Sequence, residues 1–243
     1  MQMGQRRSER FVEALLEKME TSSLSVGIAP SFPLIQALAT RAAGSFLKIG
    51  AQNVSEFSEG AYTGEVAATV LKEIGAHFVI IGHSERRTHF QETDDAIHQK
   101  IARALESGLL PIVCVGETKK ERDHGRTQEV LADQLEGAFK PFSNKPPKDI
   151  VIAYEPVWAI GTGESATPEE AQKIHESIRN FIKMEWGERA AEKLSILYGG
   201  SVKPSNLSAL IKNPDVDGAL VGGASLEVES FVTLIKEAEG ARL

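Results

Sequence analysis

The sequence of 243 residues has few cysteines, no excess of basic charge and no long apolar run. Its one cysteine, Cys114, excludes an intrachain disulfide, and we expect a buried thiol in a reducing compartment. The net charge of −7, spread over mixed acidic and basic residues, argues against a nucleic-acid or membrane-surface partner. No apolar run approaches the roughly 20 residues of a membrane-spanning helix, and residues 1–10 are polar. We therefore expect a cytoplasmic protein with no membrane and no nucleic-acid partner.

The sequence does contain short apolar segments that alternate with amphipathic helical patterns. The segments are too uniformly apolar for a half-solvated antiparallel sheet, so the alternation indicates a parallel sheet covered by helices. The seven expected strands are residues 26–29, 46–51, 78–81, 112–115, 151–154, 196–198 and 219–221. The expected helices are residues 8–19, 33–43, 67–74, 94–107, 126–139, 168–185, 206–212 and 227–241. We expect a single α/β domain over residues 1–243.

A closed barrel and an open doubly wound sheet both fit this alternation, and the residues after the strands distinguish them. A barrel gathers its site from many strand ends, whereas a doubly wound sheet concentrates it at one switch point. Here polar or glycine-rich segments follow several of the expected strands. The dinucleotide-binding motif G-x-G-x-x-G does not follow the first expected strand. The pattern favours a closed (β/α)8 barrel, although only seven strands are expected where such a barrel has eight.

The segment after the fifth expected strand indicates a carboxylate beneath a flap. Glu155 follows an apolar strand, and Pro156 ends that strand because it removes a hydrogen-bond donor. Bulky apolar residues and a glycine-containing hinge complete the flap, residues 156–163. Such a flap can close over a substrate, exclude water and raise the pKa of the carboxylate. His83 follows the third expected strand, so we expect it at the same end of the barrel.

Glycine pairs follow the last two expected strands. In phosphate-binding barrels, the loops after these strands and a short helix start present backbone N–H groups to the anion. The backbone at Ser201, Gly222 and Gly223 can approach phosphate oxygens closely, because glycine carries no side chain. A negatively charged chain can therefore still bind an anionic small molecule.

Five segments resemble the signature segments of triosephosphate isomerases. They are AYEPVWAIGTG (153–163), GHSERR (82–87), YGGSV (198–202), LVGGAS (220–225) and the interface-loop sequence GAYTGE (60–65). The resemblance implies an isomerase of glycolysis and gluconeogenesis that interconverts dihydroxyacetone phosphate and glyceraldehyde 3-phosphate. It implies that the substrate is bound by Gly161, Ser201, Gly222 and Gly223, with Glu155 as catalytic base and His83 as electrophile. It also implies a homodimer that acts on small triose phosphates, and we expect no cofactor and no metal ion.

The chemistry of this reaction suits the same residues. A base must move a proton between adjacent carbons, and a donor must stabilise the enediolate oxygens. The resemblance to this family implies that a carboxylate base is paired with a neutral imidazole donor. A closed flap is also needed, because an enediolate phosphate exposed to water can eliminate its phosphate.

The resemblance fails at the N-terminus. The first strand of the family ends in an Asn-Trp-Lys-Met type of segment whose Asn and Lys reach the substrate, and neither precedes the first expected helix here. A catalytic lysine is therefore missing, and Met1 resembles the methionine that follows it. We expect the 243-residue chain to be an N-terminally truncated form, impaired in folding and turnover.

Two alternatives remain open on the sequence. The first is a non-catalytic barrel that binds a sugar phosphate or assembles with partners. The second is another phosphate-binding barrel enzyme, although a Schiff-base aldolase would need a lysine at a strand end, and none of the seven expected strands offers one.

Overall fold

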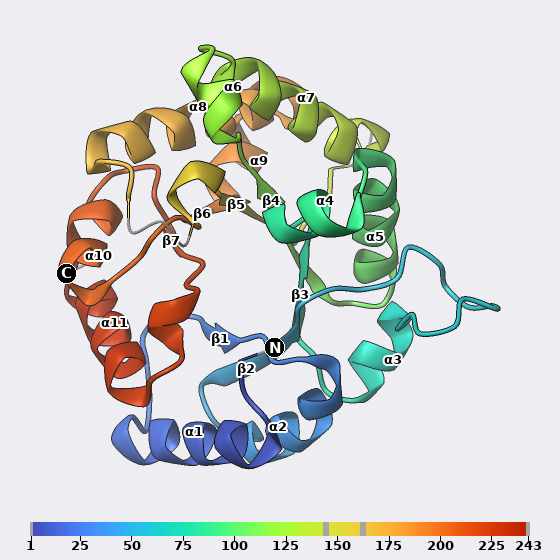
Figure 1. The fold of residues 1–243 in the computed structure, drawn as a ribbon, viewed down its shortest axis with the longest axis vertical. Helices are drawn as coiled ribbons and strands as arrows, with labels where there is room; N and C mark the ends of the chain where they lie inside the picture. The colour runs from blue at the N-terminus through green and yellow to red at the C-terminus, as the bar shows by residue number, and fades with distance from the viewer. Residues whose placement is uncertain (1, 143–145, 161–163, 242–243) are drawn as a thin grey trace.

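In a computed structural model, which describes residues 2–142, 146–160 and 164–241, one parallel sheet curls into a barrel with helices around it (Figure 1). The strands are β1 Val26–Ile28, β2 Leu47–Ala51, β3 Phe78–Ile81, β4 Leu110–Val115, β5 Val151–Tyr154, β6 Ser195–Tyr198 and β7 Gly218–Ala219. Their order in the sheet follows the chain, and each neighbouring pair is parallel. Within the described residues β1 and β7 do not pair with each other. The predicted α/β class and (β/α)8 plan are confirmed, with seven strands described.

The helices connect successive strands and cover the outside of the sheet (Figure 1). They are α1 Gln5–Lys18, α2 Ile35–Ala42, α3 Ala68–Glu73, α4 Ser84–Phe90, α5 Asp94–Glu106, α6 Lys119–Asp123, α7 Thr127–Phe139, α8 Pro168–Trp186, α9 Glu188–Lys193, α10 Pro204–Ile211 and α11 Val228–Ala241. Thr167 and Glu170 form a capping box at the start of α8. The sequence analysis missed α4, α6 and α9, because these short polar helices carry no apolar stripe. No described helix has the length and apolar character needed to cross a bilayer.

The central strands β3, β4 and β5 are buried or half-buried on both faces, and the apolar core forms two layers. Ile112 and Cys114 of β4 cluster with Phe78 of β3 inside the barrel, whereas Val113 and Val115 pack in the layer between strands and helices. Successive side chains of a strand point to opposite faces, so both layers need apolar residues. Cys114 is completely buried, as predicted.

β3 and β5 have their predicted bounds, β1, β2 and β6 differ from them by one residue at one end, and β4 and β7 differ by up to two. β4 begins at Leu110, two residues before the prediction, because a proline near the start of a strand costs only one ladder donor. β7 covers Gly218–Ala219 instead of residues 219–221, and one further bond, from the amide of Leu220 to the carbonyl of Tyr198 (2.9 Å), extends the pairing. The strand therefore ends before Val221, and the glycine pair does not follow it directly as the sequence indicated.

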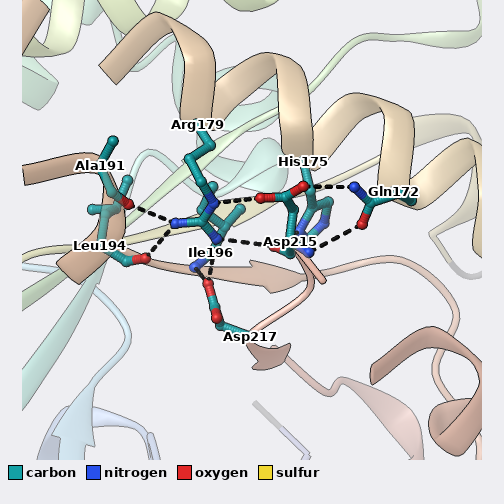
Figure 2. A network of polar contacts seen from close by, with 8 residues as sticks. All are labelled: Gln172, His175, Arg179, Ala191, Leu194, Ile196, Asp215 and Asp217. Carbon is teal, nitrogen blue, oxygen red and sulfur yellow. Dashed lines mark hydrogen bonds and ion pairs between the residues drawn. The ribbon is translucent and has the colours of Figure 1, made fainter. Parts of the chain in front are cut away.

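A polar network joins α8 to the segment that leads into β7 (Figure 2). The guanidinium of Arg179 forms ion pairs with Asp215 and Asp217. It also donates to the carbonyls of Ala191 (2.7 Å) and Leu194 (2.9 Å), at the end of α9. The side chain of Arg179 is only 19% exposed, so these groups have little access to water as a substitute partner.

We expect Arg179→Met to lower the free energy of unfolding by about 3–5 kcal/mol, because it leaves two partly buried carboxylates without a counter-charge. Arg179→Lys should lose nearly as much unfolding free energy as Arg179→Met, since an ammonium group cannot reach the same set of acceptors as a guanidinium. Urea unfolding at one protein concentration measures both. Arg126→Met is the control, because the pair of Arg126 with Glu129 is about half exposed and should contribute at most about 1 kcal/mol. Equal losses of unfolding free energy in Arg179→Met and Arg126→Met would contradict the prediction.

Candidate active site

Glu155 and His83 lie in direct contact at the carboxyl end of the barrel. His83 follows β3 and Gly82, whose φ of +73° turns the chain, and it caps the N-terminus of α4. Glu155 follows β5, and its amide donates to the carbonyl of Val115 at 2.7 Å, which prolongs the β4–β5 ladder by one bond. Its carboxylate is 2% exposed, and Oε1 lies 3.0 Å from Nε2 of His83. The two residues that the sequence singled out therefore meet across β4.

The surrounding hydrogen bonds define the tautomer of His83. Nδ1 accepts the amide N–H of Glu85 at 3.3 Å, so in the neutral ring the proton sits on Nε2 and is donated to Glu155. The second carboxylate oxygen of Glu155 accepts the amide N–H of Ser84 at 2.9 Å. A neutral imidazole and an ionised carboxylate therefore satisfy all of these contacts.

The pKa of His83 results from opposing effects. Burial by itself lowers the pKa of the imidazole, but the hydrogen bond and negative charge of Glu155 outweigh it, and the net pKa is raised. The carboxylate of Glu85, 3.9 Å from Nδ1, acts in the same direction as Glu155. When Glu155 turns away from His83, its contribution disappears and the neutral ring is favoured.

Two glycines allow neighbouring strand ends to close around Glu155. A Cβ added to Gly116, after β4, would lie 1.7 Å from the carbonyl oxygen of Glu155, and one added to Gly199, after β6, would lie 2.9 Å from its Cγ. Any larger residue at Gly116 would displace the backbone that carries the carboxylate. The sequence analysis noted Gly199 only as part of a turn and did not single out Gly116.

The first part of the flap is attached to a second buried carboxylate, Glu117. The indole Nε1 of Trp158 donates to Glu117 Oε1 at 2.9 Å, and the amide of Val157 donates to the Glu117 carbonyl at 3.1 Å. Glu117 is completely buried, and this burial raises its pKa. The sequence analysis missed Glu117, although it follows β4 much as Glu155 follows β5.

A hydrogen bond to β6 lies just beyond the second part of the flap. Gly161, with Thr162 and Gly163, lies outside the described residues. Beyond them, the amide of Ala166 donates to the hydroxyl of Tyr198, the last residue of β6, at 3.0 Å.

The remaining predicted residues, Ser201, Gly222 and Gly223, follow β6 and β7 and so lie at the same end of the barrel. Gly222 and Gly223 are exposed, and a Cβ added to either would meet no atom within 4 Å. Gly223 begins a short 3-10 helix, Gly223–Ser225. No hydrogen bond described for these three residues reaches Glu155 or His83. The structure thus presents open backbone beside the strand ends.

A carboxylate and an imidazole in contact are the groups that move a proton between carbon atoms. At the carboxyl ends of two barrel strands, they indicate the class of barrel isomerases. The family model "Triosephosphate isomerase" matches residues 1–238. Among similar relatives, those from Hahella chejuensis (47% identical, 96% of this chain, 92% of the relative) and Herpetosiphon aurantiacus (46%, 97% and 95%) are both named triosephosphate isomerase. A relative of that name from Protochlamydia amoebophila is 47% identical over 93% of this chain and 86% of its own.

The chain belongs to the triosephosphate isomerase family. It is an enzyme of the triose phosphates, and its reaction is the interconversion of dihydroxyacetone phosphate and glyceraldehyde 3-phosphate. The comparisons favour this reading over the non-catalytic barrel and over a different phosphate-binding barrel enzyme.

We expect Glu155→Gln to lower the pKa of His83, because glutamine keeps an acceptor near Nε2 but removes the charge that opposes the effect of burial. Titration of the His83 ring by NMR measures this pKa. Glu85→Gln is the matched control and should lower it less, since that carboxylate lies farther from the ring. An equal decrease in both variants, or none in Glu155→Gln, would contradict the prediction.

Proposed function

We propose that Glu155 is the base and His83 the electrophile of the isomerase reaction. The carboxylate removes a proton from one carbon of the substrate, while the Nε2–H of His83 donates to the carbonyl oxygen of the neighbouring carbon. The same carboxylate then returns the proton to the second carbon. The hydroxyl proton of the first carbon moves to the former carbonyl oxygen by way of the His83 imidazole, which donates its Nε2 proton to one oxygen and takes a proton from the other, so the ketose becomes an aldose. The observation that carries this proposal is the 3.0 Å contact between Glu155 Oε1 and His83 Nε2 at the carboxyl end of the barrel.

Substrate binding has to open this contact. In the described structure the Nε2–H of His83 donates to the carboxylate of Glu155, which also accepts the amide N–H of Ser84. A substrate carbonyl would take over the Nε2–H of His83, and Glu155 would then be free to reach the carbon-bound proton. Separation of the charge from the imidazole lowers the pKa of His83 at the moment when a neutral donor is needed.

Glu155→Asp tests the base. The substitution keeps the charge but withdraws it by about one methylene, and a misplacement on the order of 1 Å costs roughly 100-fold in turnover. Affinity for a phosphate-bearing inhibitor should change little. Glu85→Asp, at a side chain that is 71% exposed, is the control and should turn over normally. Near-normal rates in Glu155→Asp would exclude this role.

The phosphate site proposed here consists of backbone N–H groups at Ser201, Gly222 and Gly223, with Gly161 of the flap added on the resemblance to the family. Its support is the open space beside Gly222 and Gly223 and the short helix that begins at Gly223. Backbone donors suit a chain of net charge −7, because they bind an anion without basic side chains.

Gly223→Ala and Gly223→Asp test this site as a pair. Both side chains fit sterically, since a Cβ at this position meets no atom within 4 Å. The aspartate should weaken binding of a phosphate-bearing inhibitor by about tenfold more than the alanine does, because it places a like charge near the anion. Inhibition constants measured at two salt concentrations provide the comparison. Equal constants for the two variants would exclude the assignment.

A homodimer is the quaternary structure proposed for the chain. Tyr62 is 44% exposed and stacks on Phe57 at a centroid distance of 3.7 Å in the loop that resembles the interface loop of the family. A cavity of about 410 Å³ lies beside this loop and includes Arg86 and the exposed Phe90. Aromatic and arginine side chains are typical of protein interfaces, and the loop of a second copy could fill this cavity.

The cytoplasmic location is also part of the proposal, supported by the single buried thiol. The expected lack of a cofactor or metal ion stays a prediction, as does the expected impairment of turnover without the lysine.

A further inference from the structure

Gly82 links β3 to His83, and side chains bind both of its backbone polar groups. Its amide N–H donates to Oε1 of Glu92 at 3.1 Å, and its carbonyl oxygen accepts the Nε–H of Arg87 at 3.0 Å. The N–H belongs to the peptide plane before Gly82, and the carbonyl belongs to the plane that continues into His83. The two side chains therefore hold the planes on either side of this glycine.

The conformation of Gly82 depends on such support. Its φ of +73° lies in a region that glycine enters and leaves at little cost, because it has no Cβ. A larger residue could not fix the turn in its place, since an added Cβ would lie 2.9 Å from Cδ1 of Ile97. Neighbouring groups, rather than Gly82 itself, therefore determine the direction in which the chain enters His83.

Arg87 is fixed by partners other than Gly82. Its side chain is 18% exposed, and Nη1 donates to Oδ1 of Asp94, the first residue of α5, at 2.7 Å. Its backbone N–H donates to the carbonyl of His83 at 3.2 Å, at the start of α4. Nη2 makes a weak contact of 3.5 Å with the carbonyl oxygen of Cys114, on β4. Arg87 thus joins the end of β3 to β4 and α5.

Glu92 holds the other side of Gly82 and is fixed as well. Its side chain is 3% exposed, and Oε2 accepts the Nε–H of Arg86 at 2.6 Å and an N–H of Lys100. Burial by itself raises the pKa of Glu92, but the hydrogen bonds and charges of Lys100 and Arg86 outweigh it, and the net pKa is lowered. Glu92 therefore stays ionised, with Oε1 on the Gly82 amide, and a change at Arg87 alters only one side of the glycine.

We propose that Arg87 is a positioning residue for His83: by holding the Gly82 carbonyl, it sets the place of the imidazole against the substrate carbonyl. This inference rests on the proposed function, in which His83 is the electrophile. The side-chain contacts described for Arg87 end on Gly82, Asp94 and Cys114, so it acts through the backbone. Without its bond the peptide between Gly82 and His83 can rotate, and Nε2–H meets the substrate oxygen at a poorer distance and angle.

Arg87→Lys tests this role, because lysine keeps the charge beside Asp94 but cannot donate to Gly82 and Asp94 with the same planar fork. We expect kcat per folded molecule to fall roughly tenfold with little change in KM, since a displacement of about 1 Å costs roughly 100-fold. The native circular dichroism signal at the assay temperature gives the folded fraction. Unchanged kcat in Arg87→Lys overturns the proposal.

Arg179→Lys is the matched control. The side chain of Arg179 is 19% exposed and also combines ion pairs with bonds to backbone carbonyls, but it lies on α8. Its substitution should lower stability without changing kcat per folded molecule. Equal falls of kcat in the two variants would assign the effect to lost stability and overturn the proposal.

The pKa of His83 is a readout that lost stability by itself does not move. The contact with Glu155 raises this pKa against the effect of burial, so an imidazole displaced from the carboxylate should have a lower pKa. NMR titration of the folded protein should show the decrease in Arg87→Lys but not in Arg179→Lys. Because arginine and lysine carry the same charge, the decrease reports position. An unchanged pKa in Arg87→Lys overturns the proposal.

Asp94→Asn carries the same test if Arg87→Lys does not fold. Asparagine keeps the shape of the side chain but removes the charge that holds Nη1 of Arg87, so the pKa of His83 should again decrease. Asp95→Asn is its control, because Asp95 lies in the same first turn of α5 and is exposed. An equal pKa of His83 in these two variants would overturn the proposal.

A double-substitution cycle distinguishes action through His83 from other effects. In a His83→Gln background the imidazole is absent, so Arg87→Lys should reduce kcat by a smaller factor than in the unmodified chain. Losses that multiply fully would overturn the proposal. Normal turnover in His83→Gln would exclude the proposed function itself, whereas a loss there with normal turnover in Arg87→Lys would exclude only the role of Arg87. The NMR titration needs no turnover, so it decides that role even if the chain lacks isomerase activity.

Discussion

The parallel alignment of the strands is the constraint on which the site depends. Because each strand runs in the same direction as its neighbours, the residues that follow them lie at one end of the barrel. Glu155 and His83, which are far apart in the sequence, can therefore meet at 3.0 Å across β4. The glycines after β4 and β6 leave room for Glu155, since a side chain at Gly116 would collide with its backbone carbonyl and one at Gly199 with its Cγ.

The layer between strands and helices links stability to function. Tyr154 and Tyr198 occupy positions of this layer that elsewhere carry Val or Ile, yet their hydroxyls reach the groups that hold the flap. The Arg179 network anchors the segment of Asp215, whose carbonyl in turn holds the ring of His175. Packing that supports the barrel thus also supports the residues at the two ends of the flap.

The electrostatics of His83 depend on its contact with Glu155. In the described structure the carboxylate of Glu155 raises the pKa of His83, although burial opposes it. In the reaction that we propose, substrate separates the two groups, the contribution of Glu155 is lost, and the lower pKa favours a neutral imidazole donor. The hydrogen bond between Glu155 and His83 therefore raises the pKa of His83 in the described structure and has to break in the reaction that we propose.

The sequence by itself determined the class of the fold and the residues at the strand ends. Uniformly apolar strands alternating with helices predicted the parallel barrel, and the segments around Glu155 and His83 predicted the family. The sequence did not indicate Glu117, Gly116 or the links of Tyr154 and Tyr198 to the flap. Those roles depend on contacts between neighbouring strands and an outer helix, which only the tertiary structure decides, because no local pattern records which groups a buried side chain will touch.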